Sequence, residues 1–389
     1  MYGHTEDGEL TSEIVTLLRR LIQFRSTDTR PDQLKKIVDF VADYFKDVPV
    51  FLQRFTFGDK PALVITTQPT KTPALFFQGH LDVVEGEDAQ FQPFIQGENL
   101  YGRGAVDMKG FDAIVLSLLK RKALEGTDLD FGIMLTSDEE IGSENGAKKL
   151  AELSYACNVL LNGDGGYHHV LVYAEKGILK FKLSVQATPG RHPYPWQGGN
   201  AFDELIQNYN RIVALFPNQT LATDDDNWYT TFSTYDVRVE NDRQFPPKFA
   251  ELKMNVYFTE PYSTEEYFRK IQSVLSPGVE MQRLSASERV YLDPKNPYFR
   301  KMQAILSRHF DRPIPAKAEN GSSDARFFTQ KCPAILILKV VGEGHHTPTE
   351  FIHIPSILPL YRAIEEFAEQ VAHATPLSKK REVLDEAHS

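Results

Sequence analysis

The sequence predicts an α/β protein in which a mostly parallel sheet domain is interrupted by a smaller inserted domain. Three observations support this prediction. Short apolar runs alternate with amphipathic helical patterns over the first third of the chain, as in β-α units. The pattern then changes to strands with one polar face, and the α/β pattern returns after Pro294. At 389 residues the chain is also long enough for two hydrophobic cores.

Residues 1–175 are predicted to form the first part of the sheet domain. Two amphipathic patterns at the start predict helices, and a Pro31–Asp32 pair marks the beginning of the second one. Apolar runs bounded by glycine and polar residues then predict buried strands, with helical patterns between them. The predicted helices cover 10–24, 32–45, 110–123 and 146–153, and the predicted strands cover 48–55, 62–66, 74–77 and the runs before Glu139 and Asp164.

Residues 176–290 are predicted to form the inserted domain. Residues 178–185 alternate between apolar and polar side chains, which is typical of a strand with one face in water. The elements that follow complete the order β-α-β-β-α-β, the split ferredoxin-like unit. They are predicted as a helix over 201–215, strands over 229–239 and 250–258, a helix over 264–274 and a strand over 279–283. The sheet domain resumes over 291–389, with a helix over 297–310, a strand over 334–340 and a helix over 355–372.

The composition favours an ordinary globular protein of the cytoplasm. Lys and Arg number 43 against 53 Asp and Glu, a net charge of −10, and the lack of a basic block argues against nucleic acid as a partner. No apolar run is long enough to span a membrane. The start of the chain has neither the basic residues nor the apolar core of an export signal. Cys157 and Cys332 are expected to be buried, reduced thiols, which fits the same location.

Potential metal ligands follow directly after the apolar runs of the sheet domain. They are His80, Asp107, Glu139, Glu140, Asp164 and His346. In an open α/β sheet, ligands bind outside the carboxyl ends of the strands, so residues scattered along the chain would meet in one crevice. Histidines and carboxylates that meet there predict a metal site with a catalytic role.

Each motif taken alone has a simpler interpretation. His80 and Asp82 could be a hydrogen-bonded pair in a loop, although a metal-bound imidazole does need a nearby acceptor to fix its orientation. The acidic run with Glu139 and Glu140 could be a solvated turn. It follows a strand too apolar for the surface, however, and adjacent carboxylates can divide metal binding from proton transfer. The glycine-flanked Asp107 does not suit a phosphate loop, because its carboxylate would repel a pyrophosphate. The joint occurrence of these motifs at strand ends favours the metal site.

Four segments resemble motifs of the M20 metallopeptidase family. They are Gly-His-Leu-Asp-Val-Val (79–84), Gly-Arg-Gly-Ala-Val-Asp-Met-Lys-Gly (102–110), Ser-Asp-Glu-Glu-Ile-Gly-Ser (137–143) and Gly-His-His-Thr-Pro-Thr-Glu (344–350). This family includes acetylornithine deacetylase, succinyl-diaminopimelate desuccinylase, aminoacylases and glutamate carboxypeptidases. The resemblance implies a zinc-exopeptidase-like catalytic domain that binds two Zn²⁺ ions, with Co²⁺ or Mn²⁺ as alternatives. It also implies an inserted ferredoxin-like lid domain, which often forms a homodimer.

The resemblance implies how the residues of the site divide their roles. One metal would be bound by His80 and Asp164, the other by Glu140 and His346, and both by Asp107. Asp82 would orient a metal-bound histidine, and Glu139 would act as the general base. His346 is preferred over His345 as the ligand, because the family's last histidine precedes a glutamate by four positions, which here is Glu350.

Two further segments resemble parts of the family outside the metal site. The segment around His192 resembles the part of the lid whose histidine reaches the active site of the partner subunit. His192 is therefore a catalytic candidate, and Asn200 in the same segment is a substrate-binding candidate. The segment 321–327 resembles a substrate-binding loop of the deacylases, so Ser323 and Arg326 are also substrate-binding candidates.

The function expected on these grounds is hydrolysis of an amide bond in an N-acyl amino acid or a small peptide. Glu139 would take a proton from the water that attacks the carbonyl group and return it to the leaving amine. A carboxypeptidase or dipeptidase of the same family is an alternative, because Gln244 and Tyr257 stand where the family's lid commonly has an Asn and an Arg. An alternative of another class is a non-catalytic protein that uses the metal to bind a small ligand, although such a protein needs no proton carrier at Glu139.

Overall fold

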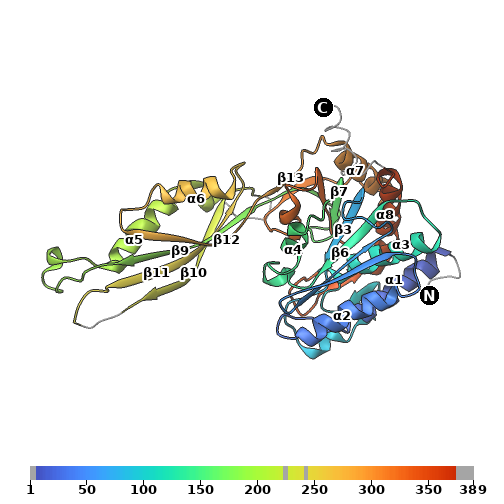
Figure 1. Cartoon of the computed structure of the whole chain (residues 1–389), viewed down its shortest axis with the longest axis horizontal. Coiled ribbons are helices and arrows are strands. Elements are labelled where there is room, and N and C mark those ends of the chain that lie inside the picture. The colour runs from blue at the N-terminus through green and yellow to red at the C-terminus, as the bar shows by residue number, and fades with distance from the viewer. Residues whose placement is uncertain (1–5, 222–226, 241–243, 374–389) are drawn as a thin grey trace. The chain divides into compact units, whose positions relative to one another are not determined.

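The computed structural model describes residues 6–221, 227–240 and 244–373, and the chain divides into two compact units. Unit 1 comprises Met1–Tyr173, Tyr291–Glu319 and Ser323–Ser389, and unit 2 comprises Ala174–Val290 and Asn320–Ser322. Unit 1 is therefore built from segments on both sides of unit 2 in the sequence. Within it, the early blue helix α1 (Glu6–Ile22) and the late red helix α8 (Ile357–Val371) lie side by side (Figure 1).

The core of unit 1 is a sheet whose central strands are parallel. Among the described residues its strands follow the order β1-β2-β6-β3-β7-β15-β8-β13, with β14 paired to β8. Strands β6, β3, β7 and β15 are parallel neighbours, whereas β1 and β2 form an antiparallel edge. The strands are β1 (Phe51–Phe57), β2 (Lys60–Thr66), β3 (Leu75–His80), β6 (Phe131–Thr136), β7 (Val159–Asn162), β8 (Leu171–Glu175), β13 (Val290–Tyr291), β14 (Ala316–Glu319) and β15 (Ala334–Ile337). The predicted α/β class with a mostly parallel sheet is confirmed.

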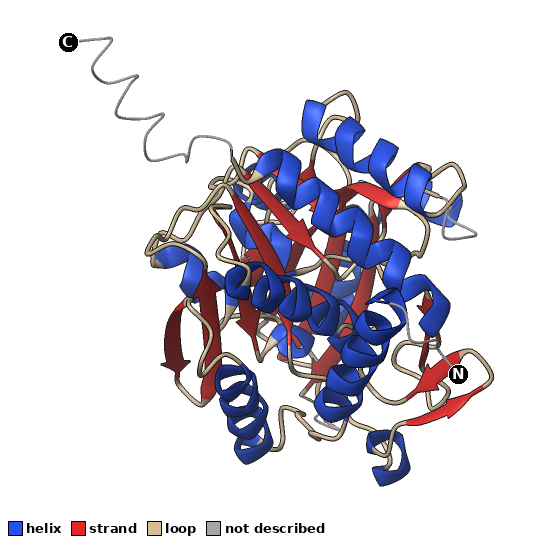
Figure 2. Ribbon diagram, turned by 90° about the vertical axis from the view of Figure 1, so that its right-hand side faces the viewer, coloured by secondary structure: helices blue, strands red, loops and turns tan. Residues whose placement is uncertain are grey.

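Helices cover this sheet and complete its core, as Figure 2 shows. Helix α3 (Lys109–Leu124) packs against β3, α1 and α8, and its sequence is accordingly apolar on almost every side. Helix α1 (Glu6–Ile22) is amphipathic instead and buries the face that carries Leu10, Ile14 and Leu18. The other helices of unit 1 are α2 (Pro31–Tyr44), α4 (Ala147–Glu152), α7 (Pro297–His309) and α8 (Ile357–Val371).

A second, small sheet in unit 1 joins distant parts of the chain. Its antiparallel order is β16-β17-β5-β4, formed by β16 (Gly342–Glu343), β17 (Phe351–His353), β5 (Asn99–Tyr101) and β4 (Phe94–Gln96). This sheet was not predicted, because strands of two or three residues are too short to show a period. It matters for the site, since β5 leads into the loop of Asp107 and β17 follows the loop of His346.

Unit 2 contains a four-stranded antiparallel sheet in the order β10-β11-β9-β12. Helices α5 (Ala201–Val213) and α6 (Thr264–Gln272) lie on one face of it (Figure 1). The strands are β9 (Gly177–Gln186), β10 (Thr231–Val239), β11 (Phe249–Phe258) and β12 (Val279–Ser287). Buried and half-buried residues alternate along β9, as the sequence predicts. The order of elements along the chain is the split ferredoxin-like β-α-β-β-α-β.

Most predicted elements differ from the observed ones by a few residues at their ends. The strand predicted over 48–55 begins at Phe51, because the N–H of Val48 closes a turn on the backbone oxygen of Phe45. The short strands β8, β13 and β14 were not predicted. No helix within the described residues is long and apolar enough to cross a membrane.

Cys157 and Cys332 are free and buried thiols, as the sequence predicts. Although they are 175 residues apart in the sequence, their Sγ atoms lie 3.3 Å from each other. The reason is the strand order, since the two cysteines precede β7 and β15, which are parallel neighbours.

Candidate metal centre

His80, Glu139, Glu140 and Asp164 lie at one edge of the large sheet, whereas Asp107 and His346 lie in loops next to strands β5 and β17 of the small sheet. Strand β3 ends at His80, which lies opposite Thr136 in the parallel strand β6. Glu139 and Glu140 lie in a short 3₁₀ turn just after β6, and Asp164 follows the end of the neighbouring parallel strand β7. Because these strands run in the same direction, the side chains that follow them meet at the same edge.

His80 is buried and is held on one side by Asp82. Its Nδ1 lies 3.0 Å from the backbone oxygen of Asp82 and 3.5 Å from Oδ1 of the same residue. Asp82 is fixed in turn, because its Oδ2 accepts the backbone N–H of Glu140 at 3.0 Å. The other ring nitrogen of His80, Nε2, is buried and has no hydrogen-bond partner within the described parts of the chain. An imidazole oriented through one nitrogen, with the other nitrogen bare, is the usual arrangement of a metal-ligating histidine.

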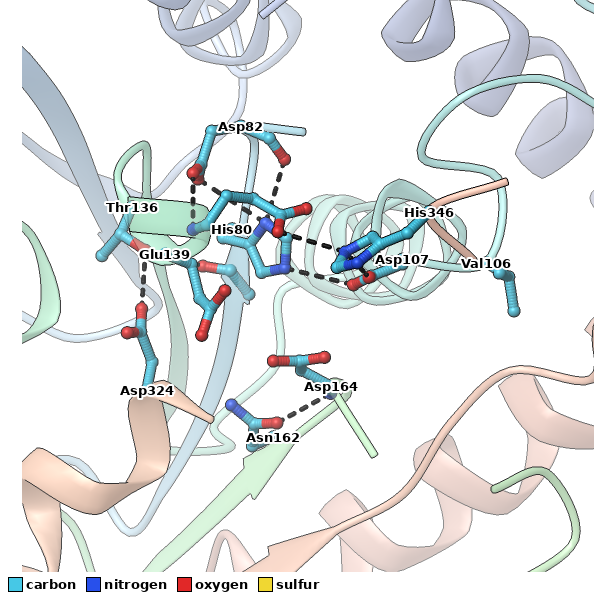
Figure 3. A network of polar contacts seen from close by, with 12 residues as sticks. His80, Asp82, Val106, Asp107, Thr136, Glu139, Asn162, Asp164, Asp324 and His346 are labelled. Atoms are coloured by element: carbon cyan, nitrogen blue, oxygen red, sulfur yellow. Dashed lines mark hydrogen bonds and ion pairs between the residues drawn. The ribbon is translucent and has the colours of Figure 1, made fainter. Parts of the chain in front are cut away.

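The remaining candidate ligands lie close to His80 or to one another (Figure 3). Ligand atoms of His80, Asp107 and Glu140 lie within 4.8 Å of one another, and so do those of His80, Glu139 and Asp164. Asp107 lies between two histidines, since its Oδ1 is 3.4 Å from Nε2 of His80 and its Oδ2 is 3.1 Å from Nε2 of His346. Nε2 of His346 is also 3.2 Å from Oε2 of Glu140. The five predicted ligands and Glu139 are therefore brought together in one cluster.

The carboxylates of this cluster stabilise positive charge among them, either on a protonated histidine or on a bound cation. Hydrogen bonds to Asp107 and Glu140 raise the pKa of His346 to about 10. Burial opposes the ionisation of Asp107, but its contacts with the imidazole groups of His346 and His80 outweigh burial and hold its pKa well below the usual range. A divalent cation could take over the role of the histidine protons, because imidazole binds a metal in its neutral form. The mixed nitrogen and oxygen donors therefore fit a divalent metal.

Glu139 is the candidate for proton transfer. Burial raises the pKa of its carboxyl group well above the usual range, and the nearby Asp164 carboxylate raises it further. Cations bound to His80 and Asp164 would act in the opposite direction and favour the ionised form. A buried carboxyl group with a strongly shifted pKa, beside potential metal ligands, is typical of a catalytic acid or base.

Arg326 contacts the turn that carries Glu139. Its Nη1 lies 3.7 Å from Oε1 of Glu139, and its Nη2 donates to the backbone oxygen of Gly142 and to Oγ of Ser143, both at 3.1 Å. The side chain is buried. These contacts give Arg326 a part in holding the turn, and its role in binding a substrate stays a prediction.

The other predicted residues outside the metal cluster have defined local positions. Ser323 is buried and caps a short 3₁₀ turn by accepting a backbone N–H. Asn200 caps α5 in unit 2, where its Oδ1 accepts the N–H groups of Phe202 and Asp203. His192 lies in an exposed turn of unit 2. Their roles toward a substrate stay predictions.

Asp324 is a buried carboxylate beside the site that was not predicted. Its Oδ2 accepts a hydrogen bond from Oγ1 of Thr136 at 2.9 Å, and its charge raises the pKa of Glu139 (Figure 3). The signal was present in the sequence, since Asp324 stands between Ser323 and Arg326 in a segment already singled out.

Histidines and carboxylates gathered at the carboxyl edge of an α/β sheet are typical of metallohydrolases. Residues 76–370 match the model of peptidase family M20/M25/M40. Because this match covers most of the chain, the protein belongs to that family and is a hydrolase of the metallopeptidase class. The resemblance drawn from the four sequence motifs is confirmed.

The chain is also similar to individual relatives over nearly its whole length. It is 22% identical over 386 residues to a succinyl-diaminopimelate desuccinylase of Rickettsia bellii, a match that covers 92% of this chain and 97% of the relative. The M20 family metallo-carboxypeptidase Sso-CP2 from Sulfolobus solfataricus superposes with a TM-score of 0.73 at 14% identity, covering 93% of this chain and 100% of that chain. The YXEP protein of Bacillus subtilis, a dinuclear metal binding peptidase from the M20 family, superposes with a TM-score of 0.66 at 13% identity, covering 94% and 99%. The two solved structures establish the shared fold.

Proposed function

We propose that unit 1 hydrolyses the amide bond of an N-acyl amino acid or a small peptide with the help of two bound divalent metal ions. The observation that carries this proposal is the position of Asp107, whose two carboxylate oxygens face different histidines, His80 and His346. A carboxylate placed in this way can bridge two ions, as in other hydrolases with paired metals. Asp164 would join His80 on one ion, and Glu140 would join His346 on the other.

Zn²⁺ is the proposed metal, because mixed imidazole and carboxylate ligands suit it, and Co²⁺ or Mn²⁺ could occupy the same ligands. When bound, two such ions polarise a scissile carbonyl group and lower the pKa of a water molecule. The bare, buried Nε2 of His80 supports the fit of a metal at this place.

The protein's own groups supply orientation and proton transfer. Glu139 takes a proton from the attacking water and returns it to the leaving amine, which is too basic to leave without one. Asp82 keeps Nε2 of His80 directed into the cluster by holding Nδ1. Arg326 holds the turn of Glu139 through the backbone oxygen of Gly142.

Unit 2 is proposed to act as a lid and as a dimerisation domain of this catalytic unit. Its helix α5 exposes Phe202 and Ile206, one turn apart, and its edge strand β10 exposes Tyr235 and Val237. Exposed apolar side chains on a sheet edge and a helix favour pairing with a second copy of the chain. His192 would then donate to the developing oxyanion, an interaction worth roughly 3 kcal/mol in other enzymes.

The substrate class is tested with a panel of N-acetyl-amino acids, N-succinyl-amino acids and dipeptides, using metal-free protein with and without added Zn²⁺. We expect cleavage that requires the metal and stops when a chelator is added. Preference for acyl amino acids would identify a deacylase, and preference for dipeptides would identify a peptidase. Two bound ions without cleavage of any panel member would contradict the proposed hydrolysis and favour a binding protein.

His192→Ala is expected to lower kcat by about 10²–10³-fold, because one oxyanion donor is lost. The number of bound metal ions should stay the same, since His192 lies in unit 2 and outside the metal cluster. Both quantities are measured on the best panel substrate, with Arg191→Ala as a control at the neighbouring exposed position.

The same variant tests whether His192 acts in the partner subunit. Mixed with Glu139→Gln protein, it should form hybrid dimers in which one site has both groups intact, so that part of the activity returns. Hybrid dimers that stay inactive would contradict a site shared between subunits.

A further inference from the structure

A buried carboxylate, Glu350, connects the loop of Asp107 with the loop of His346. The Glu350 side chain is only 1% exposed. Its Oε1 accepts the backbone N–H groups of Val106 and Asp107, at 3.0 and 3.2 Å. Its Oε2 accepts a hydrogen bond at 2.7 Å from Nη1 of Arg103, which is also buried. One side chain therefore holds the peptide groups that lead into Asp107 and a charged group of the same loop.

The backbone of Glu350 brings the two loops to the same place. Strand β17 pairs with β5 in antiparallel register, and the pairing continues one step further, because the N–H of Gly102 donates to the backbone oxygen of Glu350 at 3.0 Å. The chain therefore leaves β5 toward Asp107, and reaches β17 from His346, at the same end of this strand pair.

The loop of His346 needs an anchor because its backbone is strained. His346 has a φ of 61°, a left-handed conformation that disfavours residues with a Cβ atom. Within the loop, the N–H of Thr347 donates to the backbone oxygen of Gly344 at 2.9 Å and closes a tight turn. Gln90 ties this turn to the other loop, since its Nε2 donates to the backbone oxygen of Thr347 at 3.1 Å and its own backbone oxygen accepts the N–H of Arg103 at 2.9 Å.

We propose that Glu350, through its ion pair with Arg103, is a positioning residue that sets the distance between Asp107 and His346 and thereby the affinity for the second of two metal ions. This inference rests on the proposed function, in which Asp107, His346 and Glu140 bind that ion. Charge-assisted hydrogen bonds such as those of Glu350 are short and directional, which suits them to fixing a loop.

The two ions depend on Glu350 to different degrees. The second ion takes two ligands, Asp107 and His346, from the loops that Glu350 joins. The first ion takes only Asp107 from them, because His80 and Asp164 follow strands β3 and β7. Loss of the Glu350 contacts should therefore lower the affinity for the second ion far more than the affinity for the first.

Glu350→Gln tests this inference with Co²⁺ alone as the probe, added to metal-free full-length protein. The amide oxygen of Gln can still accept the N–H groups of Val106 and Asp107, but Arg103 loses its charged partner. Changing a residue that supports a metal ligand typically weakens metal binding by about 10–100-fold. By calorimetry and Co²⁺ absorption we expect the variant to bind the first ion as the wild type does, and the second ion about 10–100-fold more weakly.

Glu365→Gln is the matched control, because Glu365 also forms ion pairs, with Arg362 and Lys122, on helix α8 and outside the metal cluster. It should bind both ions normally. A Glu350→Gln protein that melts earlier but binds both ions like the wild type would overturn the positioning role. A wild-type protein that binds fewer than two ions would overturn the proposed function as well, so the two failures are distinguishable.

Arg103→Lys tests the same contact if Glu350→Gln does not fold. It keeps both charges but loses the planar guanidinium that reaches Oε2 of Glu350. We expect Arg103→Lys to lower the affinity for the second ion less than Glu350→Gln does, and to leave the affinity for the first ion unchanged. The inference would be overturned if the variant bound both ions more weakly to the same extent, or if it bound both as tightly as the wild type.

Discussion

Glu139→Gln is expected to reduce turnover by about 10²–10⁴-fold while both metal ions stay bound. Gln keeps the size of the side chain but cannot accept the proton of the attacking water or return it to the leaving amine. The half-buried Glu139 carboxylate lies near His80 and Asp164, so it is close to the place where the proposed metal ions would bind. The measurement is kcat on the best panel substrate, together with metal content by emission spectrometry.

Metal content decides what Glu139 does, because its carboxylate also lies with His80 and Asp164 in a group that could hold a metal ion. A Glu139→Gln protein that loses one ion would make Glu139 a ligand and contradict its role as the base. Glu144→Gln is the matched control, since Glu144 is an exposed acid of the same loop that pairs with Lys148. It should change neither kcat nor metal content.

Asp107→Asn is expected to abolish the binding of at least one metal ion and to lower turnover by about three orders of magnitude or more. Asn offers one ligand oxygen in place of two, so it cannot face both His80 and His346 with an acceptor. A metal ion supplies several kcal/mol of transition-state stabilisation, and each 1.36 kcal/mol corresponds to about tenfold in rate. Ion binding is measured by calorimetry on the metal-free protein, and turnover on the reloaded protein.

Asp112→Asn provides the comparison for that result. Asp112 lies on α3, one turn after the Asp107 loop, and burial raises the pKa of its carboxyl group well above the usual range. It belongs to neither ligand group. The Asp112→Asn protein should therefore still bind both metal ions. Retention of two ions and normal turnover by Asp107→Asn would contradict a bridging carboxylate.

Most of the site residues that could be predicted from the sequence lie at the ends of predicted strands. His80, Glu140 and Asp164 follow apolar runs, and in neighbouring parallel strands such residues meet at one edge even when the strand order is unknown. The elements themselves follow from local patterns, as in β9, where the alternation of side chains matches the alternation of burial. Local pattern therefore accounts for the fold class and for His80, Glu140 and Asp164, whereas Asp107 and His346 lie next to strands of the small sheet that has no such pattern.

Contacts between distant segments could not be predicted in the same way. Neither the ion pair of Glu350 with Arg103 nor the approach of Cys157 to Cys332 leaves a periodic signal, because each depends on which strands are neighbours. Arg326 shows the same limit. Its motif indicated a residue near the site, but the partner of its guanidinium depends on how one 3₁₀ turn packs against another.

Because β17 pairs with the much earlier strand β5, the donors proposed for the two metal ions are synthesised at different times. The donors proposed for the first ion, His80, Asp107 and Asp164, have all been translated before unit 2 begins. His346 and Glu350 are translated only after all of unit 2, and β17 must then pair with a strand made about 250 residues earlier. The complete cluster therefore forms only when the late strand β17 has paired with the early strand β5.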